Sequence, residues 1–374
     1  MHPERFEREI TEKTGGRRWA QGRLNFLISN HKNQRESRLG TDMKKLINDP
    51  RKVALEAIEG LALAFPQYVR KVNGHLAVVR KEAPISGKVT ILTGGGSGHE
   101  PMFASYVGRG MADASVAGNV FTSPPPPPIY ETSKLADGGA GILFIYGNYS
   151  GDVLNFEIAA EMLQQEKISV ATVRVADDVA SAPPERKGER RGIAGDLFVI
   201  KVAGARAEEG GTLQEVATAA EKANENTRSM GVALSSCIIP ASGRLIFDLP
   251  ENEMEVGMGL HGEPGVQRGP MLTADEVAAE IVHRILADLP AKSGDELAVL
   301  VNGLGATPLS ELFIVFRAVS RLLEDAGLLA MRSYVGNYAS SLDMAGCSVT
   351  LMRLDPELKR LLLAPAECPA LVQV

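Results

Sequence analysis

The sequence predicts an α/β fold with two α/β domains, and three observations support this prediction. Short apolar segments rich in β-branched residues recur along the chain, and amphipathic segments with helical periodicity lie between them. Such alternation is typical of parallel strands joined by crossover helices. The chain has 374 residues, of which 44% are hydrophobic, so it is long enough for two ordinary globular domains.

The first domain is predicted over residues 43–228. A helix is expected to begin at Asp49 and Pro50, which have the residue types of a helix cap and a first helical position. The other elements predicted in this domain are strands 88–92, 141–146 and 170–175 and helices 153–165 and 213–224.

The second domain is predicted over residues 229–374, after a boundary near residues 229–231. A new series of apolar strands and amphipathic helices begins there. Its predicted elements are strands 232–234, 296–301 and 349–352 and helices 274–288 and 309–326.

Two segments lie outside this pattern. Residues 1–42 are rich in Arg, Glu, Asn and Gln, and a start-like Met43 follows them. We interpret them as a disordered arm or as upstream or cloning-derived sequence, and a helical arm that packs on a partner is the alternative. Five consecutive prolines, 124–128, predict a stiff polyproline II segment that forms a rigid internal loop.

Composition and charge exclude several classes of function. The formal net charge is -6, so the chain has no overall attraction to nucleic acid or to an anionic membrane surface. No apolar run is long enough to span a bilayer, and the charged N-terminus lacks the apolar core of a signal peptide. Cys237, Cys347 and Cys368 lack the spacing of metal ligands, which favours buried thiols in the reducing cytoplasm.

The first chemically informative segment follows predicted strand 88–92. Residues 94–101 read GGGSGHEP, and they match neither a P-loop nor a dinucleotide-binding glycine motif. A glycine run lets backbone amides approach a ligand, and His99 then lies at the carboxyl end of a strand, where open α/β sheets bind ligands. His99 could exchange a proton with a sugar hydroxyl. The alternative is a glycine-rich turn with an incidental histidine.

The second segment follows predicted strand 141–146. Residues 148–157 read NYSGDVLNFE, and Asp152 falls where the next helix begins. A carboxylate there is a common helix N-cap. The same carboxylate could accept a proton from a substrate hydroxyl, so both interpretations stay open.

The third segment, residues 259–265, reads GLHGEPG. Its glycines would give a small electrophile access to His261, and a neutral imidazole nitrogen can attack a carbonyl carbon. A turn histidine bonded to backbone is the alternative.

Together these three segments resemble the dihydroxyacetone kinase K subunit. Further matching segments are FTSP at 121–124, RRGIA at 190–194, LGATPLSEL at 304–312 and YASSLDMAG at 338–346. The resemblance runs from Met43 to the C-terminus in one order, and only residues 1–42 have no counterpart.

The resemblance implies roles for particular residues. His261 would form a hemiaminal with the ketone of a short ketose such as dihydroxyacetone or erythrulose, and His99 and Asp152 would act as acid and base. The residues expected to line the bound sugar are Gly96, Ser97, Gly98, His99 and Asp152. No metal site is expected in this chain.

The resemblance also implies partners. The nucleotide-binding L subunit of this family holds ATP or ADP with Mg²⁺ through an aspartate cluster near a GDGD-type motif. The adjacent pair Asp177 and Asp178 lacks those glycines, so the phosphoryl donor is expected on a separate L subunit, which is recharged by a phosphotransferase-system protein where it holds ADP. A homodimer is the family expectation.

One position departs from the family pattern. Gly147 replaces the lysine that usually precedes the Asn-Tyr pair and contacts the substrate. This loss of an ammonium group favours an altered ketose, such as one with four carbons. The alternative to an enzyme is a ketose sensor, because some relatives of this subunit act as co-activators of a transcription regulator.

Overall fold

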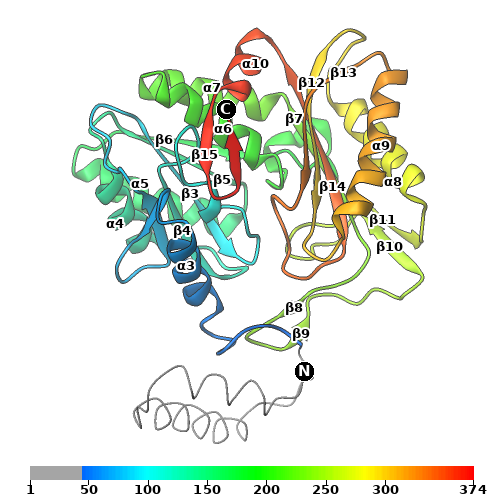
Figure 1. Cartoon of the computed structure of the whole chain (residues 1–374), viewed down its shortest axis with the longest axis horizontal. Helices are drawn as coiled ribbons and strands as arrows, with labels where there is room; N and C mark the ends of the chain where they lie inside the picture. The colour runs from blue at the N-terminus through cyan, green and yellow to red at the C-terminus, as the bar shows by residue number, and fades with distance from the viewer. Residues whose placement is uncertain (1–43) are drawn as a thin grey trace, which may run out of the picture. The chain divides into compact units, whose positions relative to one another are not determined.

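The computed structural model describes residues 44–374, which are the coloured part of Figure 1. The predicted arm, residues 1–42, lies outside the described residues. Residues 46–374 form one compact unit that contains two six-stranded sheets. The α/β fold class is therefore confirmed, and the division into domains at residue 229 stays a prediction. Strand β7 of the second sheet already begins at Thr227.

The first sheet has the strand order β1-β2-β4-β3-β5-β6. Strands β3, β5 and β6 are parallel, as predicted. Strand β4, which was not predicted, pairs parallel with β3, while β1 and β2 pair antiparallel at one edge. The strands are β1 (Val69–Lys71), β2 (Ala77–Arg80), β3 (Thr90–Ser97), β4 (Ala114–Val120), β5 (Ile142–Gly147) and β6 (Val170–Val175).

Helices cover both faces of this sheet. On one face, α4 (Pro126–Ala136) and α5 (Ser150–Gln165) bury Ile129 and Phe156 against the strands. The elements in the core of the other face are α3 (Val53–Ala64), α6 (Asp196–Glu208), α7 (Leu213–Glu225) and the 3₁₀ turn η2 (Ala104–Tyr106).

The second sheet has the order β11-β10-β7-β14-β12-β13. Only β12 and β13 are parallel, so the expectation of parallel strands is wrong for this sheet. Its strands are β7 (Thr227–Ala233), β10 (Glu253–Val256), β11 (Gln267–Pro270), β12 (Glu296–Gly303), β13 (Leu329–Gly336) and β14 (Gly346–Leu354). Strands β10 and β11 pair antiparallel through a ten-residue connection, which needs no crossover helix.

Helix α6 lies between the two sheets (Figure 1). Its Phe198 ring packs 5.8 Å from the ring of Tyr334 in the second sheet. Helices α8 (Ala274–Asp288) and α9 (Leu309–Asp325) cover the opposite face of that sheet. The smaller elements are η3 (Pro184–Glu189), β8 (Ile238–Ile239), β9 (Arg244–Leu245), α10 (Pro356–Leu363), β15 (Ala366–Cys368) and β16 (Leu371–Gln373).

Two local predictions are wrong for identifiable reasons. The proline run is not a polyproline II loop throughout, because α4 already begins at Pro126. Proline fits the first turn of a helix, where its missing N–H leaves no hydrogen bond unmade. The first predicted helix also begins later than expected. Its N-cap is Lys52 and its first residue is Val53, because residues 49–52 form a turn.

The three cysteines are buried, as predicted, and each is present as a thiol. Among residues 44–374, no helix is both long enough and apolar enough to cross a membrane.

Strand β3 continues through the glycine run, which was predicted to follow the strand rather than to belong to it. Neighbouring strands and helices approach these residues too closely for side chains. A Cβ atom at Gly94 would overlap the carbonyl oxygen of Val116 on β4. The glycines therefore allow a close-packed strand end rather than a flexible loop.

The substitution Gly94→Ala is expected to lower the free energy of unfolding by about 1–3 kcal/mol, because the overlapped atom belongs to backbone that cannot rotate away. Gly60→Ala is the matched control, because no atom lies within 4 Å of its Cβ position in α3. That change is expected to raise stability by about 0.5–1 kcal/mol. Equal stability changes of the two variants in urea unfolding would contradict this account.

Candidate active site

The three predicted polar residues come from elements of both sheets. His99 lies two residues after the end of β3, Asp152 lies in the first turn of α5 after β5, and His261 lies in the turn that follows β10. The Nε2 atoms of His99 and His261 are 3.0 Å apart, although 162 residues separate them in sequence. Asp152 is close enough to His261 for their charges to interact.

His99 is held in one orientation and one tautomer. Its side chain is buried, and its Nδ1 atom lies 2.8 Å from the carbonyl oxygen of Ser340. A carbonyl can only accept, so Nδ1 carries the hydrogen, and Nε2 of the neutral ring is a free acceptor. Burial, aided by the charge of His261, lowers the pKa of His99 to about 3. Near neutral pH His99 is therefore an uncharged acceptor aimed at His261.

His261 is oriented by Glu263, which sequence reasoning did not single out. The Nδ1 atom of His261 lies 3.1 Å from Oε1 of Glu263, and its backbone N–H donates to Oε2 at 2.9 Å. Burial acts to raise the pKa of Glu263, but the hydrogen bond and charge of His261 outweigh it and lower that pKa to about 2. The carboxylate is thus ionised and fixes the Nδ1 hydrogen of His261. The sequence did offer one signal for this role, because Glu263 lies only two residues after His261 in the same glycine-rich turn.

These constraints place one proton between the two rings. Both Nδ1 hydrogens are committed to oxygen acceptors, so two bare Nε2 atoms 3.0 Å apart would repel each other. A single proton between them removes this repulsion. Because burial lowers the pKa of His99 to about 3, His99 is the acceptor of the hydrogen bond between the two rings.

Asp152 is not the helix N-cap, so that interpretation is wrong. Tyr149 occupies the N-cap position of α5, and Asp152 lies three residues further on. Its Oδ1 atom is buried and accepts no hydrogen bond from the described protein groups. Burial raises its pKa to about 6, against smaller opposing effects of Ser123 and His261. A carboxylate with this pKa and a free oxygen can act as a base near neutral pH.

The glycine-run residues support this arrangement. The Ser97 hydroxyl donates to the carbonyl oxygen of Gly118 at 2.7 Å, and the Gly98 amide donates to the Glu100 carboxylate at 3.0 Å. Gly98 has a φ of +101°, which glycine adopts without strain. Several polar groups of this turn are therefore already bonded to protein. Whether Gly96, Ser97 and Gly98 contact a ligand remains a prediction.

Two aromatic residues that the sequence did not reveal enclose the histidine pair. The Phe121 ring stacks on His99 at 4.9 Å, and Tyr149 meets His261 edge-on at 4.8 Å. Phe121 has a φ of 56°, which is costly for a bulky residue and suggests that its neighbours hold it in place. The pair therefore sits among aromatic walls that limit its contact with water.

The adjacent aspartates Asp177 and Asp178 hold neighbouring loops. Asp177 accepts from the amides of Ile193 and Gly195, each at 2.8 Å. Asp178 forms an ion pair with Arg191 at 2.7 Å. Within residues 44–374, no group of three or more acidic, histidine or cysteine side chains is arranged to hold a metal ion.

Comparison with known proteins identifies the family. The model of the Dak1 domain matches residues 59–370. The chain belongs to the Dak1 family. It is 47% identical over 328 residues to the dihydroxyacetone-binding subunit DhaK of the PTS-dependent dihydroxyacetone kinase 2 of Listeria innocua, and the match covers 87% of this chain and 98% of that protein. The predicted relation to the dihydroxyacetone kinase K subunit is confirmed.

Two further proteins that are similar to this chain have different roles. The chain is 46% identical to the D-erythrulose kinase of Mycolicibacterium smegmatis over 88% of its own length, but it spans only 56% of that longer protein. A solved structure of the dihydroxyacetone kinase operon co-activator DhaQ aligns with a TM-score of 0.81 at 32% identity, covering 87% of this chain and 99% of that one. The fold is therefore shared by kinase subunits and by a co-activator.

Proposed function

We propose that this Dak1 chain is the substrate-binding and catalytic subunit of a ketose kinase, and that it holds a short ketose as a hemiaminal on His261. The observation that carries the proposal is the contact between the Nε2 atoms of His99 and His261 at 3.0 Å. This contact supplies both a nucleophile and a base that frees it.

The proposed adduct forms in three balanced steps. His261 passes its Nε2 proton to Nε2 of His99, and the freed lone pair attacks the ketone carbon. The π electrons of the carbonyl move to its oxygen, which takes the proton from His99. The product is an N-substituted imidazolium on His261, whose positive charge faces the ionised carboxylate of Glu263. His99 returns to its neutral form.

Asp152 is proposed to complete the transfer. Its free Oδ1 atom would accept the proton of the terminal hydroxyl as that oxygen attacks the phosphoryl group. Glycerol has no carbonyl and cannot form the adduct, so the anchor selects ketoses over polyols. The anchor would also fix the reacting hydroxyl for in-line attack.

The donor is proposed to reside on a separate L subunit that carries ATP or ADP with Mg²⁺, with a phosphotransferase-system protein as a further partner where the nucleotide is ADP. Support comes from the near-complete match with a relative named as the binding subunit of a PTS-dependent kinase. Asp177 and Asp178 are already bonded within the protein and offer no nucleotide-metal site. We further propose a homodimer and a reducing location such as the cytoplasm, which suits three buried thiols.

A reconstitution experiment tests this proposal. The chain is mixed with ATP, Mg²⁺ and dihydroxyacetone, with and without a candidate L subunit. Phosphorylation only when the L subunit is present is the expected result. Activity of the chain alone would contradict the two-subunit proposal, and ketose binding without activity under any partner would favour a sensor. The presence of Asp152 and His99 favours an enzyme over a sensor, because a sensor needs only His261 to hold the ketose.

The rate should depend on pH through Asp152. Because the base must be ionised and its pKa is raised to about 6, kcat/KM is expected to rise as the pH increases through about 6 and then to level off. An acid limb centred near the ordinary aspartate value of 3.8 would contradict the role of this burial. The limb should disappear in Asp152→Asn.

Gly147 is proposed to set the preferred ketose. A Cβ atom at this position would lie 3.1 Å from both the Gly192 carbonyl oxygen and the Tyr149 ring, so a side chain would crowd the ring that contacts His261. Glycine at position 147 therefore leaves Tyr149 where it is, and the lysine that is usual at this position in the family is absent. Similarity to an erythrulose kinase supports a four-carbon substrate.

The substitution Gly147→Lys is expected to lower the ratio of kcat/KM for erythrulose to kcat/KM for dihydroxyacetone by at least about tenfold. Gly147→Ala is the control that adds the Cβ contact without the ammonium group. Equal turnover of dihydroxyacetone by wild type and Gly147→Lys, with no activity on four-carbon ketoses in either, would contradict the assignment.

A further inference from the structure

A cavity lies behind the glycine-rich end of β3, on the face opposite Asp152. Its volume is about 220 Å³, and helix α3, strand β4 and the segment around η2 complete its walls. Successive strand residues face opposite sides of a sheet. A Cβ at Gly94 would approach Phe156 of α5, the helix that carries Asp152, whereas a Cβ at Gly95 would meet Phe103 of the cavity wall. His99, Asp152 and His261 do not line this cavity.

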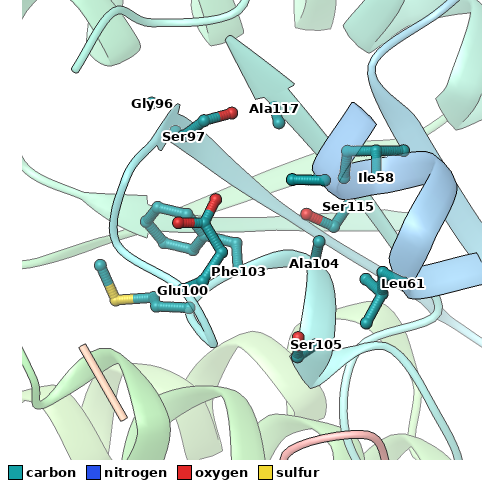
Figure 2. Close-up of a pocket in the computed structure, with 13 residues that line it drawn as sticks. Ile58, Leu61, Gly96, Ser97, Glu100, Phe103, Ala104, Ser105, Ser115 and Ala117 are labelled. Carbon is teal, nitrogen blue, oxygen red and sulfur yellow. The ribbon is translucent and has the colours of Figure 1, made fainter. Parts of the chain in front are cut away.

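The cavity has an apolar body. Figure 2 shows Ile58 and Leu61 of α3 on one side and Phe103 on the other. Met102 and Ala117 extend the apolar lining. At about 220 Å³, the space is smaller than the roughly 300–1,000 Å³ of sites for drug-sized ligands, so it suits a molecule of only a few non-hydrogen atoms.

Two kinds of polar group, a hydroxyl and a carboxylate, line this otherwise apolar cavity. Ser115 of β4 is buried, and its hydroxyl has no hydrogen-bond partner. Thr93, its register partner on β3, also has a buried hydroxyl without a partner, but it does not line the cavity. A buried hydroxyl without a partner is costly, so a ligand that bonds Ser115 gains free energy.

The charge of the lining restricts the ligand further. Glu100 contributes a carboxylate that accepts a hydrogen bond from the Gly98 amide, and burial raises its pKa above the ordinary value. None of the thirteen lining residues is basic. A carboxylate attracts donors and repels anions. Phosphate esters, nucleotides and carboxylic acids are therefore disfavoured in this space.

We propose that this cavity is a second ligand site that takes a small neutral or cationic molecule, with a short alkyl body and a hydroxyl or ammonium group, bonded by Ser115 and Glu100. The alkyl body would lie against Ile58, Leu61 and Phe103. An occupant would also touch the backbone of Gly96 and Ser97. This stretch of backbone would separate the occupant from the proposed ketose site.

Probe binding to the whole chain tests the site. The probes are 1-butanol, butylammonium and, as the anionic counterpart, butyrate, measured by saturation-transfer NMR and by soaking crystals. The neutral and cationic probes are expected to bind in the millimolar range with density beside Ser115, and butyrate is not. Binding of butyrate as strong as that of butylammonium, or density elsewhere only, would overturn the proposal.

Two variants that reduce the space make the test specific. Ala117→Val narrows the floor, and Ala57→Leu narrows the mouth from an exposed position on α3, where folding is not at risk. Each is expected to weaken probe binding about tenfold or more. Unchanged binding in a folded Ala57→Leu variant would overturn the proposal. His261→Ala must leave probe binding intact, which separates this site from the proposed ketose chemistry.

Discussion

Asp152→Asn is expected to lower kcat about 10²–10⁴-fold while making the protein more stable at neutral pH. The loss of activity follows from removing the proposed base, whose contribution is typically of this size. The gain in stability follows from burial, which raises the pKa of Asp152 from 3.8 to about 6. The protonated form is favoured in the folded state, so this contribution to stability is present below about pH 4 and is lost as the pH rises to about 6.

Above pH 6 the ionised Asp152 therefore costs on the order of 2–3 kcal/mol, and the amide removes part of this cost. The measurement is urea unfolding of both proteins at pH 4 and pH 8, combined with phosphorylation rates supported by a competent L subunit. Asp325→Asn, at an exposed position at the end of α9, is the matched control and should change neither quantity appreciably. A variant that is less stable than wild type at pH 8, or one that keeps full activity, would refute the proposed role of Asp152.

His261→Ala is expected to abolish the covalent adduct and to lower kcat/KM for the ketose by roughly 10²-fold, because the substrate loses its fixed orientation. Discrimination against glycerol should fall in the same variant, since the carbonyl would no longer be used. Intact-mass analysis after incubation with several short ketoses detects the adduct, and crystal soaking is the second readout for a reversible bond.

His283→Ala provides the control, because His283 is an exposed histidine on α8. It should retain both the adduct and the rate. An adduct of unchanged yield in His261→Ala would assign the nucleophile to another residue. His99→Ala should slow adduct formation without preventing it, because His99 transfers the proton but does not form the bond.

The sequence predicted those parts of the fold that depend on local patterns. Helix α8 spans Ala274–Asp288 as predicted, because its Thr273 forms a capping box with Glu276 and its apolar positions follow one period. The antiparallel pairing of β7, β10 and β14 could not be predicted, because it depends on long-range register rather than on residue type. The glycine run gave no sign that it continues β3, since its reason is the close approach of other segments.

The residues of the candidate site could be predicted from the sequence, but the contacts between them could not. His99, Asp152 and His261 each stand out by their position near glycines and strand ends. Their mutual geometry depends on how the two sheets pack around α6, which local sequence does not encode. The tautomers of His99 and His261 depend on their contacts with Ser340 and Glu263, and the stacking on His99 depends on Phe121. These contacts join residues far apart in the sequence, so the hydrogen bond between the two histidines could not be predicted from local patterns.

The most direct test of the account is whether the nitrogen of His261 bonds to the ketone carbon. The protein is labelled with ¹⁵N in its histidine rings, saturated with [2-¹³C]dihydroxyacetone and observed by NMR at equilibrium. The account predicts a one-bond ¹³C–¹⁵N coupling to a single imidazole nitrogen, present in wild type and absent in His261→Ala. Bound dihydroxyacetone that retains its ketone signal, or its hydrate signal without any coupling to nitrogen, would contradict the covalent mechanism.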